Sequence, residues 1–102
     1  MSAVAEAEQR RQAPRQRGDV WLRATGDENM LLDHSGRNLY RLNPTALALW
    51  ELCDGTTLPE EMVEAICTLF TGIYDVIQED VERTLQAFTR AGLVEWQEVG
   101  PR

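Results

Sequence analysis

The period of the hydrophobic pattern changes at Asn43-Pro44, and this change constrains the fold more than any other feature of the sequence. Before it, three short apolar segments over residues 20–24, 29–33 and 38–42 are separated by glycine-containing loops of about four residues. Such loops are typical of hairpins, so these segments predict a three-stranded antiparallel meander. After it, apolar residues recur at helical spacing, and Asn43 and Pro44 suit the N-cap and the first position of a helix.

Three helices are expected after this point. The first ends at Asp54-Gly55, the second ends before Thr71-Gly72, and the third covers residues 78–91 and stops at Gly92. Residues 93–96 are expected to return in extended form to the domain. The predicted fold class is therefore α+β, with a three-stranded antiparallel sheet followed by three helices.

The two ends of the chain differ from its middle in composition. Residues 1–18 hold four Arg and two Glu, and Val4 is their only large aliphatic side chain beyond Met1. So little apolar surface predicts a flexible arm. We therefore expect a folded domain over residues 19–96 and a short tail over residues 97–102.

Composition excludes several functional classes. Seventeen acidic and ten basic residues give a net charge of −7, which argues against a nucleic-acid partner. All ten basic residues are Arg, so Schiff-base chemistry and a P-loop lysine are excluded. Two cysteines do not make a disulfide scaffold, and no apolar run suits a secretory signal or a membrane span. We expect a cytoplasmic protein with reduced thiols and no membrane partner.

The pattern Leu31-Leu32-Asp33, Leu42-Asn43-Pro44-Thr45-Ala46 and Gly92-Leu93-Val94 resembles the family named after protein D of pyrroloquinoline quinone biosynthesis (PqqD), over about residues 19–96. The resemblance implies a winged-helix-like fold that recognises ribosomally made peptides before their modification (RiPPs), in the free-standing form of lasso-peptide pathways. It implies that the leader peptide adds as a strand beside residues 38–42, in a cleft with helix 78–91. It also implies no cofactor and no chemistry of its own, with delivery of the peptide to tailoring enzymes such as a leader-cleaving protease.

The residues themselves are compatible with such a site. A three-stranded meander has two open edges, and strand 38–42 contains no proline and Arg41 as its only charge, so it suits β-augmentation. Period-two alternation predicts that Tyr40 and Leu42 face the helices. Short side chains on one flank of the third helix predict the groove floor, and Arg83 is expected to pair with a leader carboxylate or with Glu79. The predicted peptide-binding residues are Asn38, Leu39, Tyr40, Arg41, Leu42, Val76, Asp80, Arg83, Thr84 and Ala87.

Alternative readings remain at this point. The edge strand can instead be covered by the protein's own tail, and Ala87 can simply pack under the sheet. A winged-helix DNA-binding regulator is the second functional candidate, although residues 78–91 hold three acids and two arginines. Consecutive residues such as Asp33-His34-Ser35 cannot converge on one reacting atom, and a Cys53–His34 pair lacks an orienting group. We therefore predict no catalytic residue, no metal site and no enzyme.

Overall fold

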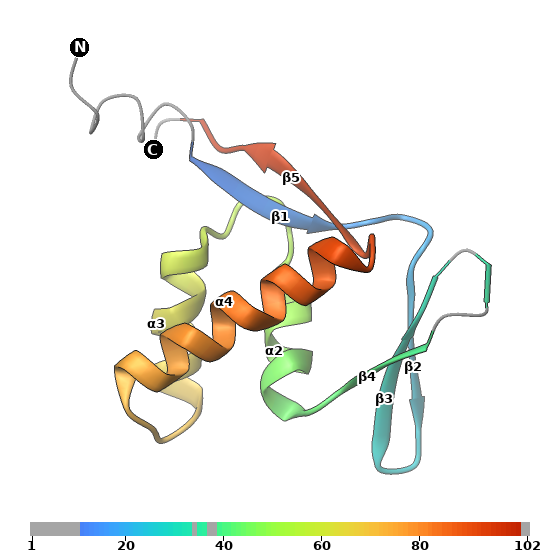
Figure 1. Cartoon of the computed structure of the whole chain (residues 1–102), viewed down its shortest axis with the longest axis horizontal. Helices are drawn as coiled ribbons and strands as arrows, with labels where there is room; N and C mark the ends of the chain where they lie inside the picture. The colour runs from blue at the N-terminus through green and yellow to red at the C-terminus, as the bar shows by residue number, and fades with distance from the viewer. Residues whose placement is uncertain (1–10, 34, 37–38, 101–102) are drawn as a thin grey trace.

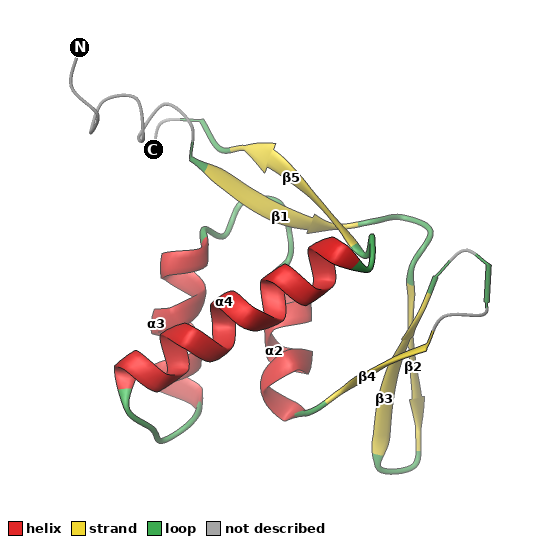
Figure 2. Cartoon of the chain, viewed as in Figure 1, coloured by secondary structure: helices red, strands yellow, loops and turns green. Residues whose placement is uncertain are grey.

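Two small antiparallel sheets pack beside three helices in the computed structural model, which describes residues 11–33, 35–36 and 39–100 (Figure 1). The three-stranded sheet and the helices confirm the predicted α+β class (Figure 2). In the described part of the chain, no helix has the length and apolar character that crossing a membrane requires. The elements in chain order are β1 (Gln12–Gln16), β2 (Trp21–Thr25), β3 (Glu28–Leu32), β4 (Leu39–Leu42), α2 (Pro44–Leu52), α3 (Pro59–Leu69), α4 (Tyr74–Arg90) and β5 (Val94–Glu98).

The predicted meander is present, with strand order β2-β3-β4. Its first turn is tighter than the expected four-residue loop, because Thr25 already pairs with Glu28. The connection is therefore Gly26-Asp27, and Gly26 has φ +60°. A two-residue hairpin loop of type II′ places a positive φ at its first position, which explains glycine there.

The helix boundaries follow local capping signals where the sequence supplies them. The side chain of Asn43 accepts a hydrogen bond from the Ala46 N–H at 2.8 Å, so the predicted N-cap of α2 is confirmed. At the end of α4, Gly92 has φ +70° and the Leu93 N–H donates to the Phe88 carbonyl at 2.9 Å, as in a Schellman motif.

The predicted start of the third helix is wrong by four residues. Helix α4 begins at Tyr74 rather than at residue 78, and its N-cap is Ile73, which makes no side-chain cap. Aliphatic residues are among the poorest N-caps, so the sequence carries no start signal at this position. The apolar contact of Ile77, which is buried in the core, holds this first turn against the rest of the helix bundle.

Aromatic packing joins the sheet to the helices. The Phe88 ring lies 5.6 Å from the Tyr40 ring of β4 and 5.6 Å from the Trp50 ring of α2, edge-on in both cases. Phe88, Val81 and Leu31 are fully buried in one core that the helices share with β3 and β4. Edge-to-face pairs of this kind add about 0.5–1.5 kcal/mol to the burial of the rings themselves.

The prediction of a flexible arm over residues 1–18 is wrong for residues 12–16, which form β1. This strand pairs antiparallel with β5, from Gln12 opposite Glu98 to Gln16 opposite Val94. Ala13 is fully buried. Strand β5 also passes the expected domain end at residue 96. Residues 1–10 lie outside the described part of the chain.

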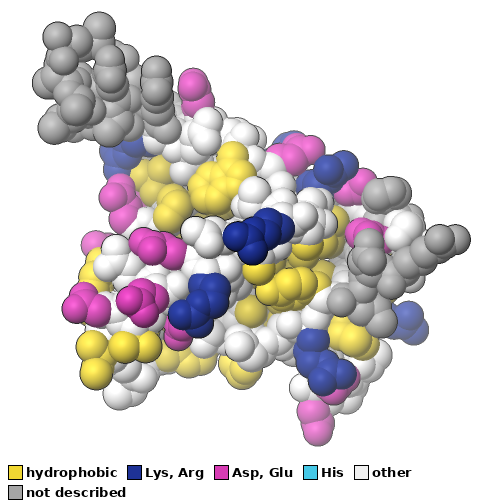
Figure 3. Space-filling view, in the orientation of Figure 1, with side chains coloured by type: hydrophobic (Ala, Val, Ile, Leu, Met, Phe, Trp, Pro, Cys, Tyr) yellow, Lys and Arg dark blue, Asp and Glu magenta, His cyan; other side chains and the backbone are white. Residues whose placement is uncertain are grey.

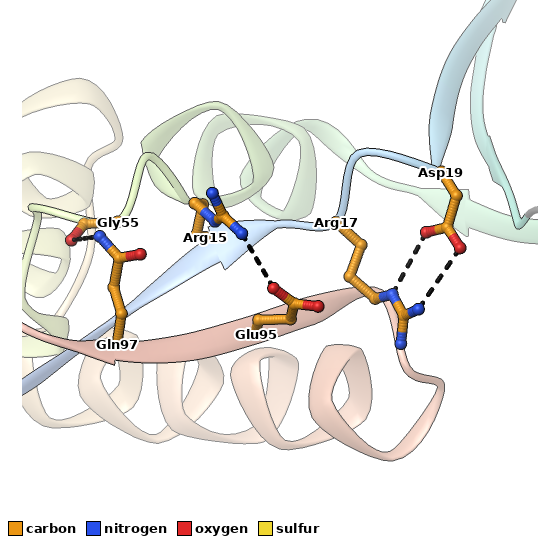
Figure 4. A network of polar contacts seen from close by, with 6 residues as sticks. All are labelled: Arg15, Arg17, Asp19, Gly55, Glu95 and Gln97. Carbon is orange, nitrogen blue, oxygen red and sulfur yellow. Dashed lines mark hydrogen bonds and ion pairs between the residues drawn. The ribbon is translucent and has the colours of Figure 1, made fainter.

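Polar contacts and main-chain hydrogen bonds hold β1 in place against the rest of the domain. Its amino-acid composition therefore did not predict a strand. The Gln16 N–H donates to the Cys53 carbonyl at 3.0 Å, and the Gly55 N–H donates to the Pro14 carbonyl at 2.9 Å. Figure 4 shows the side-chain contacts around the strand, including the ion pair of Arg15 with Glu95 at 2.9 Å. These partners lie far away in the sequence, so no local apolar pattern announces the strand.

Removal of β1 is therefore expected to destabilise the domain. Deleting residues 1–16 should lower the free energy of unfolding by about 3 kcal/mol, since several hydrogen bonds worth about 1 kcal/mol each are lost. Urea unfolding followed by circular dichroism measures the change. Deletion of residues 1–10 is the matched control and should leave the midpoint unchanged. Equal midpoints for both deletions would contradict a structural role for β1.

Candidate functional site

The outer edge of β4 is open within the described part of the chain. Strand β4 pairs with β3 on one side, and its other side faces no described strand. The C-terminal segment does not cover it, because β5 pairs with β1 instead. In an antiparallel edge strand, alternate residues direct both N–H and C=O outward, so β4 presents a short row of donors and acceptors.

The side chains of β4 divide between the two faces of the sheet as the alternation predicts. Leu42 is buried, and Tyr40 packs on Phe88, so both face the helices. Arg41 is exposed on the other face, 3.5 Å from the Glu28 carboxylate. An exposed ion pair of this kind contributes about 0–1 kcal/mol, so Arg41 remains available to other partners. Leu39 pairs with Leu32 through the backbone, and Asn38 lies outside the described residues.

Two flanks of different composition border the buried face of α4, which is centred on Val81. The flank with short side chains is half-buried at Asp80, Thr84 and Ala87. We expected Arg83 to pair with a leader carboxylate or with Glu79. In the structure it pairs with Asp80, because its Nη1 lies 3.3 Å from the Asp80 carboxylate. Phe88, the residue after Ala87, contacts Tyr40, so this turn of α4 lies next to β4.

The predicted site residues do not all lie together. Val76 precedes Phe88 by twelve residues, which corresponds to about 18 Å along a helix axis. A peptide in contact with both Tyr40 and Val76 has to extend over that distance, or about five to six residues in extended form. Thr84 and Ala87 lie within about one helical turn of Phe88, which contacts β4, whereas Val76 lies in the first turn of α4.

Two hollows lie on the opposite flank of α4, which carries Gln78, Glu82 and Thr89. One, of about 660 Å³, lies between α4, the start of α3 and the residues at the start of β1. The other, of about 450 Å³, lies between α4, Pro59 and Trp96 of β5. None of the ten predicted site residues lines either hollow. The sequence missed them because their outer walls are formed by β1 and β5, which pair over a long sequence separation.

Nucleophilic chemistry has no support in the described residues. Burial, together with the neighbouring Asp54 carboxylate, raises the pKa of Cys53 to about 12, so its thiol stays protonated at neutral pH. His34, the suggested partner of Cys53, lies outside the described residues. Among the residues with described positions, no three His, Cys, Asp or Glu side chains gather as metal ligands.

The family model of coenzyme PQQ synthesis protein D (PqqD) matches residues 28–94. No curated protein matches the chain by sequence. The solved structure of TbiB1 in complex with the TbiA(beta) leader peptide has a TM-score of 0.67 and 25% identity, covering 79% of this chain and 94% of TbiB1.

Two further structures share the fold. Lasso peptide synthetase B1 complexed with the leader peptide has a TM-score of 0.67 and 20% identity, covering 80% of this chain and 96% of that one. The solution structure of the PqqD part of PqqCD from Methylobacterium extorquens, a RiPP recognition element, has a TM-score of 0.66 and 20% identity. It covers 80% of this chain and 87% of the other.

The burial of Cys53 predicts unequal thiol reactivity. At pH 8 a thiol with a pKa of about 12 is ionised in about one molecule in ten thousand. Iodoacetamide should therefore alkylate the half-buried Cys67 and spare Cys53 in the native protein, and peptide mass spectrometry distinguishes the two. Both should react at similar rates in urea. Equal labelling in the native state would contradict the burial of Cys53.

Proposed function

The chain belongs to the PqqD family, and from this premise we propose that it binds the leader segment of a ribosomally synthesised precursor peptide. The leader adds as a strand to the outer edge of β4, and its side chains on one face lie against α4. The two leader-peptide complexes with the same fold, those of TbiB1 and of lasso peptide synthetase B1, support this proposal.

The observation that carries the proposal is the open edge of β4 beside the half-buried flank of α4. Unpaired main-chain groups supply hydrogen bonds that fix the register of an added strand, while side-chain pockets supply selectivity. Thr84 and Ala87 are short, so a peptide can approach the helix closely there. Tyr40 provides an aromatic surface between the edge and the helix.

The remaining predicted residues take defined places in this proposal. Arg41 meets the leader side chains that emerge on the face opposite the helices. Arg83 and Asp80, already paired with each other, offer one charge of each sign along α4. Alternate residues of Leu39–Leu42 contribute the outward main-chain groups of the edge strand, and Val76 is reached only by the end of a long leader.

The proposed role is delivery rather than catalysis. A recognition module of this kind presents the bound peptide to a separate tailoring enzyme such as a leader-cleaving protease. The solved lasso peptide synthetase B1 structure, with its bound leader, supports a place in lasso-peptide production. The DNA-binding alternative is disfavoured, because Asp75, Glu79, Asp80 and Glu82 make the first half of α4 repel phosphates.

Filling the flank of α4 should block the leader. Ala87→Trp is expected to lower affinity at least about tenfold, or about 1.4 kcal/mol. Fluorescence polarisation with the labelled leader peptide of a candidate precursor that binds the wild-type chain measures the loss. Gln86→Trp, on the exposed opposite flank, is the matched control. Thr84→Trp provides a second test if Ala87→Trp fails to fold, and wild-type affinity in a folded variant would reject this groove.

The strand geometry makes a separate prediction about the peptide. Replacing leader amides one at a time by N-methyl amides should weaken binding at every second position, because only alternate N–H groups face β4. Methylation at the intervening positions should change affinity by less than about twofold. A scan without this alternation would show that the leader does not bind as a strand.

A further inference from the structure

Apolar side chains gather at the connection between α3 and α4. Among the described residues, six large hydrophobic side chains are exposed, and four of them lie here: Leu69 (66%), Ile73 (71%), Tyr74 (51%) and Val76 (52%). We call these four residues the α3–α4 apolar cluster. Figure 3 shows hydrophobic side chains at the N-terminal end of α4, with acidic side chains beside them. Tyr74 borders the larger hollow beside Arg11 and Gln12, whereas Val76, two residues further on, lies on the other side of the helix, so Leu69 and Ile73 stand at the connection itself. Large apolar side chains that stay exposed together mark interaction sites in soluble proteins.

Local stability does not explain the residue at position 73. Ile73 occupies the N-cap of α4 without a side-chain cap, and it is the most exposed of the large hydrophobic residues described. Serine, asparagine or aspartate there would cap the helix, and none of them would expose an aliphatic side chain. Ile73 thus contributes neither to the cap nor to the core, which points to a contact outside the chain.

The charge around the cluster limits what can cover it. Residues 59–82 carry seven acidic side chains and no basic one. Glu60 pairs with Arg11 and Asp80 pairs with Arg83, which leaves a strong excess of negative charge on α3 and on the first half of α4. A second copy of the same face, or an anionic lipid surface, would be repelled. The seven are Glu60, Glu61, Glu64, Asp75, Glu79, Asp80 and Glu82.

The position of the cluster leaves the part of the leader site around β4 accessible. Ile73 precedes Phe88, the contact of Tyr40, by fifteen residues, or about 22 Å along the helix axis. A partner seated on the cluster therefore lies beyond one end of the proposed leader path. Val76 is the point at which the two surfaces meet, since it belongs to the cluster and to the predicted peptide-binding residues.

We propose that the α3–α4 apolar cluster docks a second, folded protein whose contact surface has an apolar pocket rimmed by Lys and Arg. The inference rests on the proposed leader-binding function, because it identifies that partner as the enzyme that acts on the delivered peptide. Apolar burial supplies the affinity and the acidic surroundings supply orientation and association rate. Docking at one end of α4 holds the enzyme next to the emerging peptide.

The test uses the full chain and the purified protease that cleaves the leader from the precursor peptide. Calorimetry should give an affinity that falls as NaCl rises from about 0.05 M to about 0.3 M, because the charges are exposed. The double variant Leu69→Gln/Ile73→Asn should bind the protease at least about tenfold more weakly. Its leader affinity should stay within about twofold of wild type, and Asn at position 73 supplies the missing cap.

The matched control is Trp21→Thr, which removes a similarly exposed apolar side chain (59%) from β2 and should bind the protease normally. Unchanged protease affinity in the double variant, or no protease binding to the wild-type chain, would overturn the docking surface. A dimer that the double variant dissociates would assign the cluster to a second copy instead. Loss of leader binding by the wild-type chain, with protease binding retained, would reject the proposed function alone.

Discussion

Phe88 packs between Tyr40 of β4 and Trp50 of α2, and the geometry of the open edge depends on this contact. Because the ring is fully buried, it fixes the separation between the strand and the helix from inside the core. The width available beside β4 is thus set by packing rather than by a mobile loop. An edge strand without such support would be free to twist away or to pair with other chains.

The pairing of β1 with β5 explains why that edge stays uncovered. The C-terminal segment contains a strand, and a three-stranded sheet nearby offers it two edges. Residues 12–16 provide a different partner, and the Arg15–Glu95 ion pair and the hydrogen bond from Gln97 to the Gly55 carbonyl secure the arrangement. A polar, proline-containing strand thereby keeps the outer edge of β4 vacant and also closes the core over Val94.

The elements that could be predicted from the sequence are those whose boundaries are set by neighbouring residues. The change of period at Asn43, the cap of α2 and the glycine stop at Gly92 were readable because each depends on neighbouring residues. Strand β1 and the start of α4 at Tyr74 were not, since one depends on distant partners and the other lacks a cap. For the site, alternation correctly placed Tyr40 and Leu42 toward the helices, but no local signal marks the start of α4 at Tyr74, which puts Val76 on the same helix as Phe88 and about three turns before it.

The register of β1 with β5 brings Gln12 opposite Glu98, so the two ends of the described chain leave side by side (Figure 1). They emerge at the opposite end of the molecule from β4. A tether attached to either end would therefore run away from the open edge of β4. The architecture is suited to covalent fusion with a catalytic module in either order, as well as to work as an independent unit.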